Sequence, residues 1–242
     1  MKNKPLIVAN WKATKTIKET VEWVQKAKGA LEEINYATIV ICAPFTSLPF
    51  VASLFKDTSI KVGAQDVSKF KKGAYTGEVT IEMLDGLVDY CIVGHSERRR
   101  LFGETDDDVI KKVDFLLQDQ IKPILCVSDL SQLDSYIERG GIIIEEVGEI
   151  IFVYEPPSAI SGGGAYHPED PEEVSANIKR MEEKIGKKLF TLYGGSVNPE
   201  NGFEFLAKDN VNGALVGQAS TDIAVFLGLL SSIKLGGVLD SH

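Results

Sequence analysis

Short apolar, β-branched runs recur along the whole of this 242-residue sequence, and charged stretches with helical spacing separate them. Few polar residues alternate within the runs, as expected of strands that are covered on both faces in a parallel sheet. The runs are residues 5–10, 37–43, 60–64, 90–94, 122–127, 150–155, 189–194 and 212–217. The pattern predicts eight strand-then-helix units.

Eight such units favour a closed (β/α)8 barrel of the α/β class. A doubly wound open sheet usually has about five to seven strands and a GxGxxG turn after the first, and the sequence shows neither. No linker or low-complexity tract interrupts the pattern, so we expect one domain over residues 1–242. The fifth unit is the weakest, because residues 129–141 offer only a short helix and residues 141–147 are ambiguous. We therefore predict a shortened helical segment after strand five.

Composition excludes several classes of partner. The 26 basic and 35 acidic residues give a net charge of −9, which argues against binding to nucleic acid or to an anionic membrane. The scattered Cys42, Cys91 and Cys126 form no CxxC pair and are typical of reduced, buried thiols in a cytoplasmic protein. We expect no metal site, since the histidines and cysteines lack ligand spacing. We also expect no signal segment and no membrane span.

Residues just past the C-terminal end of each barrel strand line the active-site face. Two of these turns are rich in glycine: Gly194, Gly195 and Ser196 follow the seventh run, and Gly217 and Gln218 follow the eighth. Backbone N–H groups hold a phosphate well, and glycine lets the backbone approach it closely. Either turn alone fits a simple tight turn equally well. Together, at this place in the fold, they favour a phosphate site.

Three reactive side chains come from other strand ends. Glu155 ends an apolar run, so burial is expected to raise its pKa towards that of a general base, although a buried ion pair is an alternative for Glu155 alone. His95 opens the fourth turn, where Ser96 is placed to cap the following helix, and the helix N-terminus favours a neutral imidazole. Lys12 can meet a phosphate or a developing oxyanion. His167 and His242 are interpreted as loop and tail residues.

Residues 156–166, with the sequence PPSAISGGGAY, combine two prolines with three consecutive glycines. We expect the prolines to stiffen the start of the segment and the glycines to make the rest of it mobile. This combination suits a lid that closes over substrate and excludes water. The lid residues are Pro156, Pro157, Ser158, Ala159, Ile160 and Gly164. The site thus offers a base, an electrophile, a cation and a phosphate cradle. Proton transfer beside a carbonyl of a phosphorylated substrate needs these parts and no cofactor.

The motifs that carry this chemistry resemble the triosephosphate isomerase family. They are NWK (10–12), GAQD (63–66), GAYTGE (73–78), VGHSERR (93–99), YEP (154–156), YGGSVNPEN (193–201) and GALVG (213–217), in the family's order and at nearly its spacing. The resemblance spans most of the chain and implies a TIM barrel. It implies an aldose–ketose isomerase of glycolysis and gluconeogenesis that interconverts dihydroxyacetone phosphate and D-glyceraldehyde 3-phosphate through an enediolate.

The resemblance also implies a role for each residue. Glu155 moves the proton, neutral His95 polarises the carbonyl, Lys12 supplies positive charge and Asn10 orients a substrate oxygen. Glu97 and Cys126 are supporting residues. The residues implied in phosphate binding are Ser161, Gly162, Gly163, Ser196, Gly194, Gly195, Gly217 and Gln218. Thr76 corresponds to the tip of a loop that enters a partner subunit, which implies a homodimer.

Three departures from the family pattern stand out. The lid carries extra glycine and serine and lacks the usual tryptophan, Gln218 replaces the second glycine after the eighth run, and the segment 126–155 is short. Because some shorter members of the family are tetramers, a tetramer is an alternative to the homodimer. Two functional alternatives also remain: another phosphosugar isomerase, and a catalytically impaired barrel homologue that acts as a binding protein.

Overall fold

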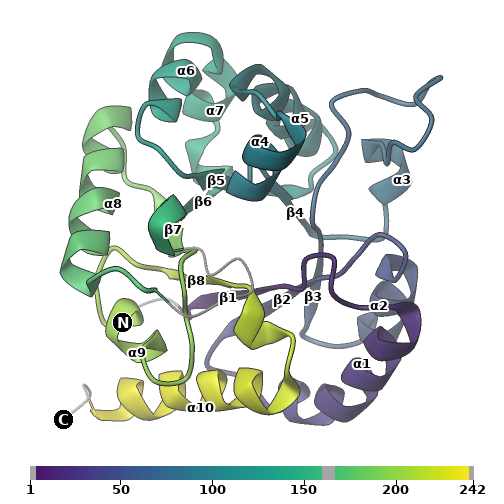
Figure 1. Cartoon of the computed structure of the whole chain (residues 1–242), viewed down its shortest axis with the longest axis vertical. Coiled ribbons are helices and arrows are strands. Elements are labelled where there is room, and N and C mark those ends of the chain that lie inside the picture. The colour runs from purple at the N-terminus through teal and green to yellow at the C-terminus, as the bar shows by residue number, and fades with distance from the viewer. Residues whose placement is uncertain (1–3, 160–166, 240–242) are drawn as a thin grey trace.

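The computed structural model describes residues 4–159 and 167–239. Within these residues eight parallel strands form a closed barrel, in which each strand pairs with the next along the chain and the last pairs with the first (Figure 1). The strands are β1 (Leu6–Asn10), β2 (Thr38–Cys42), β3 (Lys61–Ala64), β4 (Tyr90–Val93), β5 (Lys122–Val127), β6 (Ile151–Tyr154), β7 (Phe190–Tyr193) and β8 (Gly213–Val216). Each lies inside one of the eight apolar runs, so the predicted (β/α)8 barrel is confirmed.

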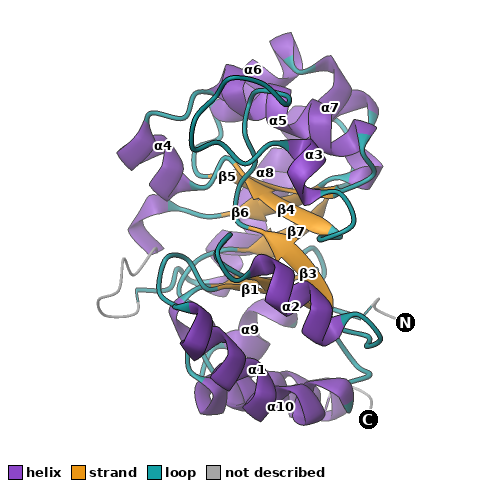
Figure 2. Cartoon of the chain, turned by 90° about the vertical axis from the view of Figure 1, so that its right-hand side faces the viewer, coloured by secondary structure: helices purple, strands orange, loops and turns teal. Residues whose placement is uncertain are grey.

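Helices surround the strands as an outer layer (Figure 2). The α-helices are α1 (Ile17–Glu32), α2 (Leu48–Phe55), α3 (Ile81–Leu84), α4 (Ser96–Phe102), α5 (Asp106–Gln118), α6 (Gln132–Arg139), α7 (Gly141–Glu145), α8 (Pro171–Ile185), α9 (Gly202–Leu206) and α10 (Ile223–Leu239). Three 3₁₀ turns are η1 (Val147–Glu149), η2 (Pro157–Ala159) and η3 (Gln218–Ser220). In the part of the chain that is described, no helix has the length and apolar character needed to cross a bilayer.

Local sequence signals explain where the long helices begin. Thr16 and Glu19 form a capping box at the start of α1, in which each side chain accepts from the other residue's backbone N–H. Thr105 and Asp108 do the same for α5. These reciprocal bonds satisfy N–H groups that the first turn of a helix leaves without partners. The charged stretches that form α1 and α5 are therefore preceded by the residues that begin each helix.

The unit after β5 is short, as predicted from its sequence. The helix α6 covers two turns, Gly140 separates it from α7, and η1 leads into β6. Tyr136 and Ile143 are fully buried and anchor these short pieces to the barrel. The segment 141–147, which was ambiguous in sequence, is therefore helical over most of its length.

Apolar side chains are buried on both faces of the strands. One cluster consists of strand residues only and fills the barrel interior, with Val8, Val40, Ile124 and Val153 among its members. A second and larger cluster fills the space between the strands and the helices. This double burial explains why the strands read as continuous apolar runs rather than as an alternating pattern.

Closure of the barrel depends on close approach between β8 and β1. A Cβ atom added at Gly213 would lie 1.9 Å from the carbonyl oxygen of Leu6, the residue that Gly213 pairs with. Backbone atoms at this seam cannot move aside as the end of a flexible side chain can. Glycine is therefore required at residue 213 by packing rather than by an unusual backbone angle.

We predict that Gly213→Ala lowers the free energy of unfolding by about 3 kcal/mol, because the new methyl group overlaps backbone atoms of β1. The measurement is urea unfolding followed by circular dichroism. Gly29→Ala is the matched control, since Gly29 lies on the exposed face of α1 with nothing within 4 Å of an added Cβ. The free energy of unfolding of the control should rise by about 0.5–1 kcal/mol, because alanine has a better helix propensity than glycine. Wild-type stability in Gly213→Ala would contradict the packing argument.

Candidate active site

Glu155 follows β6 directly and its side chain is fully buried. Its Oε1 accepts a hydrogen bond from the Ser96 backbone N–H at 2.6 Å. Its Oε2 has no hydrogen-bond partner among the described residues and lies 3.4 Å from His95 Nε2. Burial raises the pKa of Glu155 above the usual range for glutamate, while His95, the Ser96 N–H, Cys126 and Lys12 act in the opposite direction. The carboxylate therefore has the desolvated environment that suits a general base.

His95 lies between β4 and α4, where it acts as the N-cap of the helix. Its Nδ1 accepts a hydrogen bond from the Glu97 backbone N–H at 3.2 Å. Because Nδ1 accepts, a neutral ring carries its proton on Nε2, the nitrogen that faces Glu155. The prediction that Ser96 caps α4 is wrong. The imidazole of His95 takes that place by accepting from the Glu97 N–H, and Ser96 instead contributes its backbone N–H, which donates to Glu155.

Lys12 enters the same region from the end of β1. Its ammonium donates to Glu97 Oε1 at 2.5 Å, and both side chains are about a quarter exposed at 26%. The Lys12 backbone N–H donates to Asn10 Oδ1 at 3.1 Å. The second carboxylate oxygen of Glu97 lies 3.8 Å from His95 Nδ1. Glu97 thus connects the lysine from the first strand end with the histidine from the fourth.

The glycine turns after β7 and β8 form the opposite wall of a cavity. Its lining residues are Asn10, Lys12, His95, Gly194, Gly195, Ser196, Val197, Leu215, Gly217 and Gln218. Among the described residues, no acceptor bonds to the backbone N–H of Gly195, Ser196, Gly217 or Gln218. The N–H of Gly194 donates to the Tyr154 carbonyl instead, at 2.8 Å. Within residues 4–159 and 167–239, these four backbone donors therefore have no protein acceptor.

Close packing places these turns against the reactive side chains. A Cβ added at Gly217 would lie 3.4 Å from Lys12 Cε, and one at Gly194 would lie 3.0 Å from Glu155 Cβ. Glycine at both places lets the backbone come near the lysine and the glutamate. Glu155 is fully buried and is not among the residues that line the cavity, but its carboxylate lies 3.4 Å from His95, which does line it.

The residues predicted to form the lid are only partly described. Pro156 and Ala159 are buried, Ser158 is exposed and Pro157 begins η2. Ile160, Ser161, Gly162, Gly163 and Gly164 lie outside the described residues. The hydroxyl of Ser196 donates to the Ala159 carbonyl at 2.7 Å and accepts from the His167 N–H at 3.2 Å. Ser196 therefore contacts the described chain on both sides of the segment 160–166.

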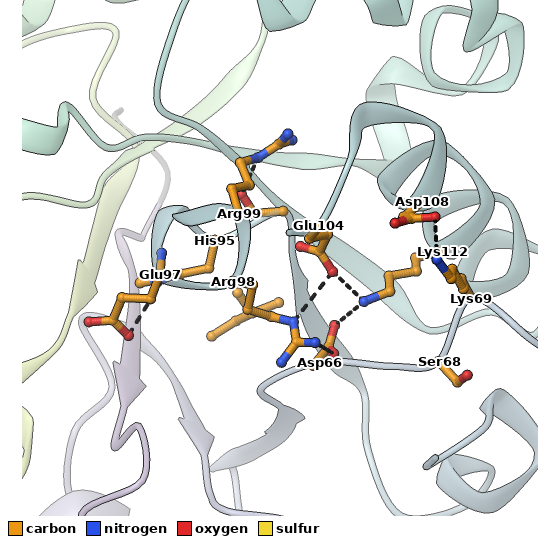
Figure 3. Close-up of polar contacts among 12 residues, drawn as sticks. Asp66, Ser68, Lys69, His95, Glu97, Arg98, Arg99, Glu104, Asp108 and Lys112 are labelled. Atoms are coloured by element: carbon orange, nitrogen blue, oxygen red, sulfur yellow. Dashed lines mark hydrogen bonds and ion pairs between the residues drawn. The ribbon is translucent and has the colours of Figure 1, made fainter. Parts of the chain in front are cut away.

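A largely buried network of ion pairs connects α4 to α5 and to the turn after β3. Lys112 on α5 donates to Asp66 Oδ1 at 2.7 Å and also to Glu104. Arg98 on α4 reaches the other Asp66 oxygen at 2.8 Å and Glu104 Oε1 at 3.3 Å (Figure 3). Two cations thus face two carboxylates, which is the arrangement that buried charges require. The network joins the end of β3 to the helix that carries His95 and Glu97.

Sequence reasoning missed this network and two hydrogen-bond donors. A signal for Lys112 was present, because it lies on the same face of α5 as the buried Val109 and Leu116. No local pattern indicates that the Ser96 N–H holds Glu155. None indicates that the Gln65 side chain donates to the Lys12 carbonyl at 3.0 Å.

The remaining predicted residues have distinct places. Cys126 is fully buried, and burial together with the neighbouring Glu155 raises the pKa of its thiol well above the usual range. It is therefore a neutral thiol next to Glu155. Cys42 and Cys91 are also free and buried. Thr76 is part of the exposed segment 71–78. The chain that leads into α3 extends away from the barrel (Figure 1). Within residues 4–159 and 167–239, no three His, Cys, Asp or Glu side chains group as metal ligands.

The fold and this site define a (β/α)8-barrel protein in which a buried glutamate and a histidine lie beside a cavity walled by two glycine turns. Residues 5–233 match the family model described as triosephosphate isomerase. A triosephosphate isomerase of Aquifex aeolicus is 39% identical over 94% of this chain and 98% of its own length. A triosephosphate isomerase of Dictyoglomus turgidum is also 39% identical, over 94% of this chain and 98% of its own length. One of Alkaliphilus metalliredigens is 36% identical over 94% of this chain and 99% of its own length. The chain belongs to the triosephosphate isomerase family.

We predict that Glu155→Gln stabilises the fold at neutral pH. A raised pKa means that protonation of Glu155 favours the folded state below the pKa of the unfolded chain, and that this contribution is lost as pH rises through the folded pKa. The uncharged amide removes the destabilising buried charge. The urea midpoint at about pH 8 should therefore exceed that of wild type, and the difference should shrink towards about pH 4.

The control is Glu183→Gln, on the exposed face of α8, which should leave the midpoint unchanged at both pH values. A Glu155→Gln protein that is no more stable than wild type at pH 8 would show that the carboxylate is not destabilised by burial.

Proposed function

We propose that this protein interconverts dihydroxyacetone phosphate and D-glyceraldehyde 3-phosphate without a cofactor, as a triosephosphate isomerase of glycolysis and gluconeogenesis. Membership of the family supports the reaction. The observation that carries the assignment of residues is the buried Glu155 carboxylate, whose unpartnered oxygen lies 3.4 Å from His95 Nε2. The two groups come from different strand ends and meet beside a wall of free backbone donors.

In the first step, Glu155 takes a proton from C1 of dihydroxyacetone phosphate. The electron pair of the broken C–H bond forms a C1–C2 double bond, and the C2 carbonyl oxygen becomes the enediolate oxygen. His95 Nε2–H donates to that oxygen as its charge develops, and the Lys12 ammonium stabilises the same charge. Asn10 orients a substrate oxygen. To reach C1, the carboxylate exchanges its hydrogen bond with the Ser96 N–H for contact with substrate.

In the second step, His95 moves a proton from the C1 oxygen to the C2 oxygen, and Glu155 returns its proton to C2. The product carries the aldehyde at C1 and the hydroxyl at C2. The phosphate binds the free N–H groups of Gly195, Ser196 and Gly217, with Gln218 beside them. A backbone donor survives the change from glycine at residue 218, so the departure there does not remove the phosphate site.

The deciding experiment is a coupled assay of D-glyceraldehyde 3-phosphate turnover on purified protein. Catalysed conversion in both directions is the expected result. A protein that binds the triose phosphate without converting it would favour the binding-protein alternative. Turnover of a larger phosphosugar in place of the triose would favour another phosphosugar isomerase.

We predict that Glu155→Asp lowers kcat by about 100-fold or more with a much smaller change in KM, because the carboxylate retracts by one methylene from the carbon that it deprotonates. Steady-state kinetics in the coupled assay measure this effect. Glu183→Asp makes the same chemical change on the exposed face of α8 and should keep wild-type kinetics. Unchanged turnover in Glu155→Asp would show that another group is the base.

We further propose that the chain forms a homodimer. A hollow beside the catalytic lysine is lined by Phe45 and Phe102, which are 37% and 68% exposed. On a separate exposed segment, Thr76 follows Tyr75, whose ring stacks on Phe70 at 4.2 Å between centroids. Exposed apolar surface of this kind marks an interface, and a projecting loop in each subunit suits a reciprocal fit into the hollow of the other.

We predict that Thr76→Arg weakens the dimer, since a long charged side chain enters a partly apolar hollow. Light scattering coupled to size-exclusion chromatography should give a dimer for wild type and a monomer for the variant at micromolar concentration. A wild-type tetramer would assign the short segment after β5 to a second interface. A wild-type monomer would refute the proposed assembly.

Three further expectations belong to this proposal. The free, buried thiols support a cytoplasmic location. Residues 1–242 are expected to act as one catalytic domain. The gating role of residues 156–166 stays a prediction, because most of that segment lies outside the described residues.

A further inference from the structure

Lys12 has a backbone conformation that needs explanation. Its φ is +49°, in the left-handed region that non-glycine residues seldom adopt. In the described part of the chain, Gln120 is the only other non-glycine residue with positive φ. Such strain persists where the surroundings impose it, and it gathers at functional sites. Neighbouring groups must therefore hold Lys12 in this conformation.

The side-chain amide of Gln65 supplies part of this restraint. Gln65 follows β3, and its Nε2 donates to the Lys12 carbonyl at 3.0 Å and to the Cys42 carbonyl at 2.9 Å. The Cys42 carbonyl also accepts from the Trp11 N–H at 3.2 Å. One amide thus joins the turn after β1 to the last residue of β2. Both hydrogens of the NH₂ group are used, and a carboxylate or an apolar side chain cannot replace them.

The restraint acts on the lysine at both of its backbone polar groups. Asn10 Oδ1 accepts from the Lys12 N–H, and Gln65 donates to the Lys12 carbonyl. Between these two hydrogen bonds the strained residue directs its side chain past Gly217 to Glu97. The position of the ammonium at the cavity therefore depends on a backbone conformation that is itself held from two sides.

We propose that Gln65 is a positioning residue, which holds Lys12 in its left-handed conformation and so places the ammonium at the anion-binding cavity. It touches no substrate in this account and acts only through Lys12. The proposal rests on the proposed function only in taking Lys12 as the residue that meets the substrate. It predicts an energetic coupling between Gln65 and Lys12 that a general effect on folding would not produce.

A double-mutant cycle tests this coupling. The variant Gln65→Met keeps the length of the side chain and removes its donors, and the probe is a phosphorylated hydroxamate whose affinity is measured by calorimetry. We expect Gln65→Met to weaken binding by about tenfold or more in the Lys12 protein and by less than about twofold in the Lys12→Ala protein. Equal weakening in both backgrounds would show a merely structural role and would overturn the proposal.

The control is Asn210→Leu. Asn210 lies between α9 and β8, and its half-buried amide Nδ2 donates to the carbonyl of Ser175 on α8. This substitution should leave binding unchanged. If Gln65→Met does not fold, Gln65→Asn, which shortens the side chain by one methylene, serves in the same cycle. A crystal structure of the unliganded Gln65 variant gives a readout that needs no ligand and no activity. Negative φ at Lys12 and a broken contact with Glu97 support the proposal, and an unchanged Lys12 refutes it.

The failure of this inference is distinguishable from the failure of the proposed function. A wild-type protein that turns over triose phosphate while Lys12 keeps its conformation in the Gln65 variant would refute the positioning role alone. A wild-type protein without turnover would refute the function, while the crystal structure of the variant would still decide whether Gln65 holds Lys12.

Discussion

Parallel pairing of β8 with β1 closes the sheet, and the site depends on that closure. In a closed parallel barrel every strand ends at the same rim, so residues far apart in the chain become neighbours. Asn10 ends β1, while His95 and Glu155 come after β4 and β6. Asn10 and His95 line one cavity, and Glu155 lies 3.4 Å from His95. The contact between Leu6 and Gly213 leaves no room for a side chain at residue 213. The glycine that closure requires therefore lies at the N-terminal end of its strand, opposite the strand ends that carry the candidate site.

Charge at the site is arranged by burial and by backbone donors. The Glu155 carboxylate is desolvated, and one of its oxygens accepts from the Ser96 N–H, while the second has no hydrogen-bond partner among the described residues and lies close to His95 Nε2. The imidazole of His95 is fixed by a backbone N–H at one nitrogen, so the other nitrogen becomes the donor. Lys12 and Glu97 neutralise each other beside the ring. In a chain of net charge −9, the proposed phosphate site therefore relies on backbone N–H groups at the turns that follow β7 and β8.

Much of this arrangement is predictable from sequence, because strand ends in a barrel share a rim and the residue types at those ends are visible. The apolar runs identified the strands to within about one residue, and the short fifth unit was visible in its lack of helical pattern. Contacts that depend on the relative placement of strands and helices were not predictable. The bonds from the Ser96 N–H to Glu155 and from Gln65 to Lys12 join residues 59 and 53 positions apart. Each needs angles and distances that no local pattern encodes.

A crystal structure of the protein with a bound phosphorylated hydroxamate would test the convergence of these groups most directly. We expect the hydroxamate oxygens to lie within hydrogen-bond distance of His95 Nε2 and Lys12 Nζ, with the phosphate on the N–H groups of the turns after β7 and β8. The Glu155 carboxylate should have left the Ser96 N–H and should face the ligand. A ligand bound away from this cavity, or a Glu155 still held by Ser96 and out of reach of the bound ligand, would contradict the account.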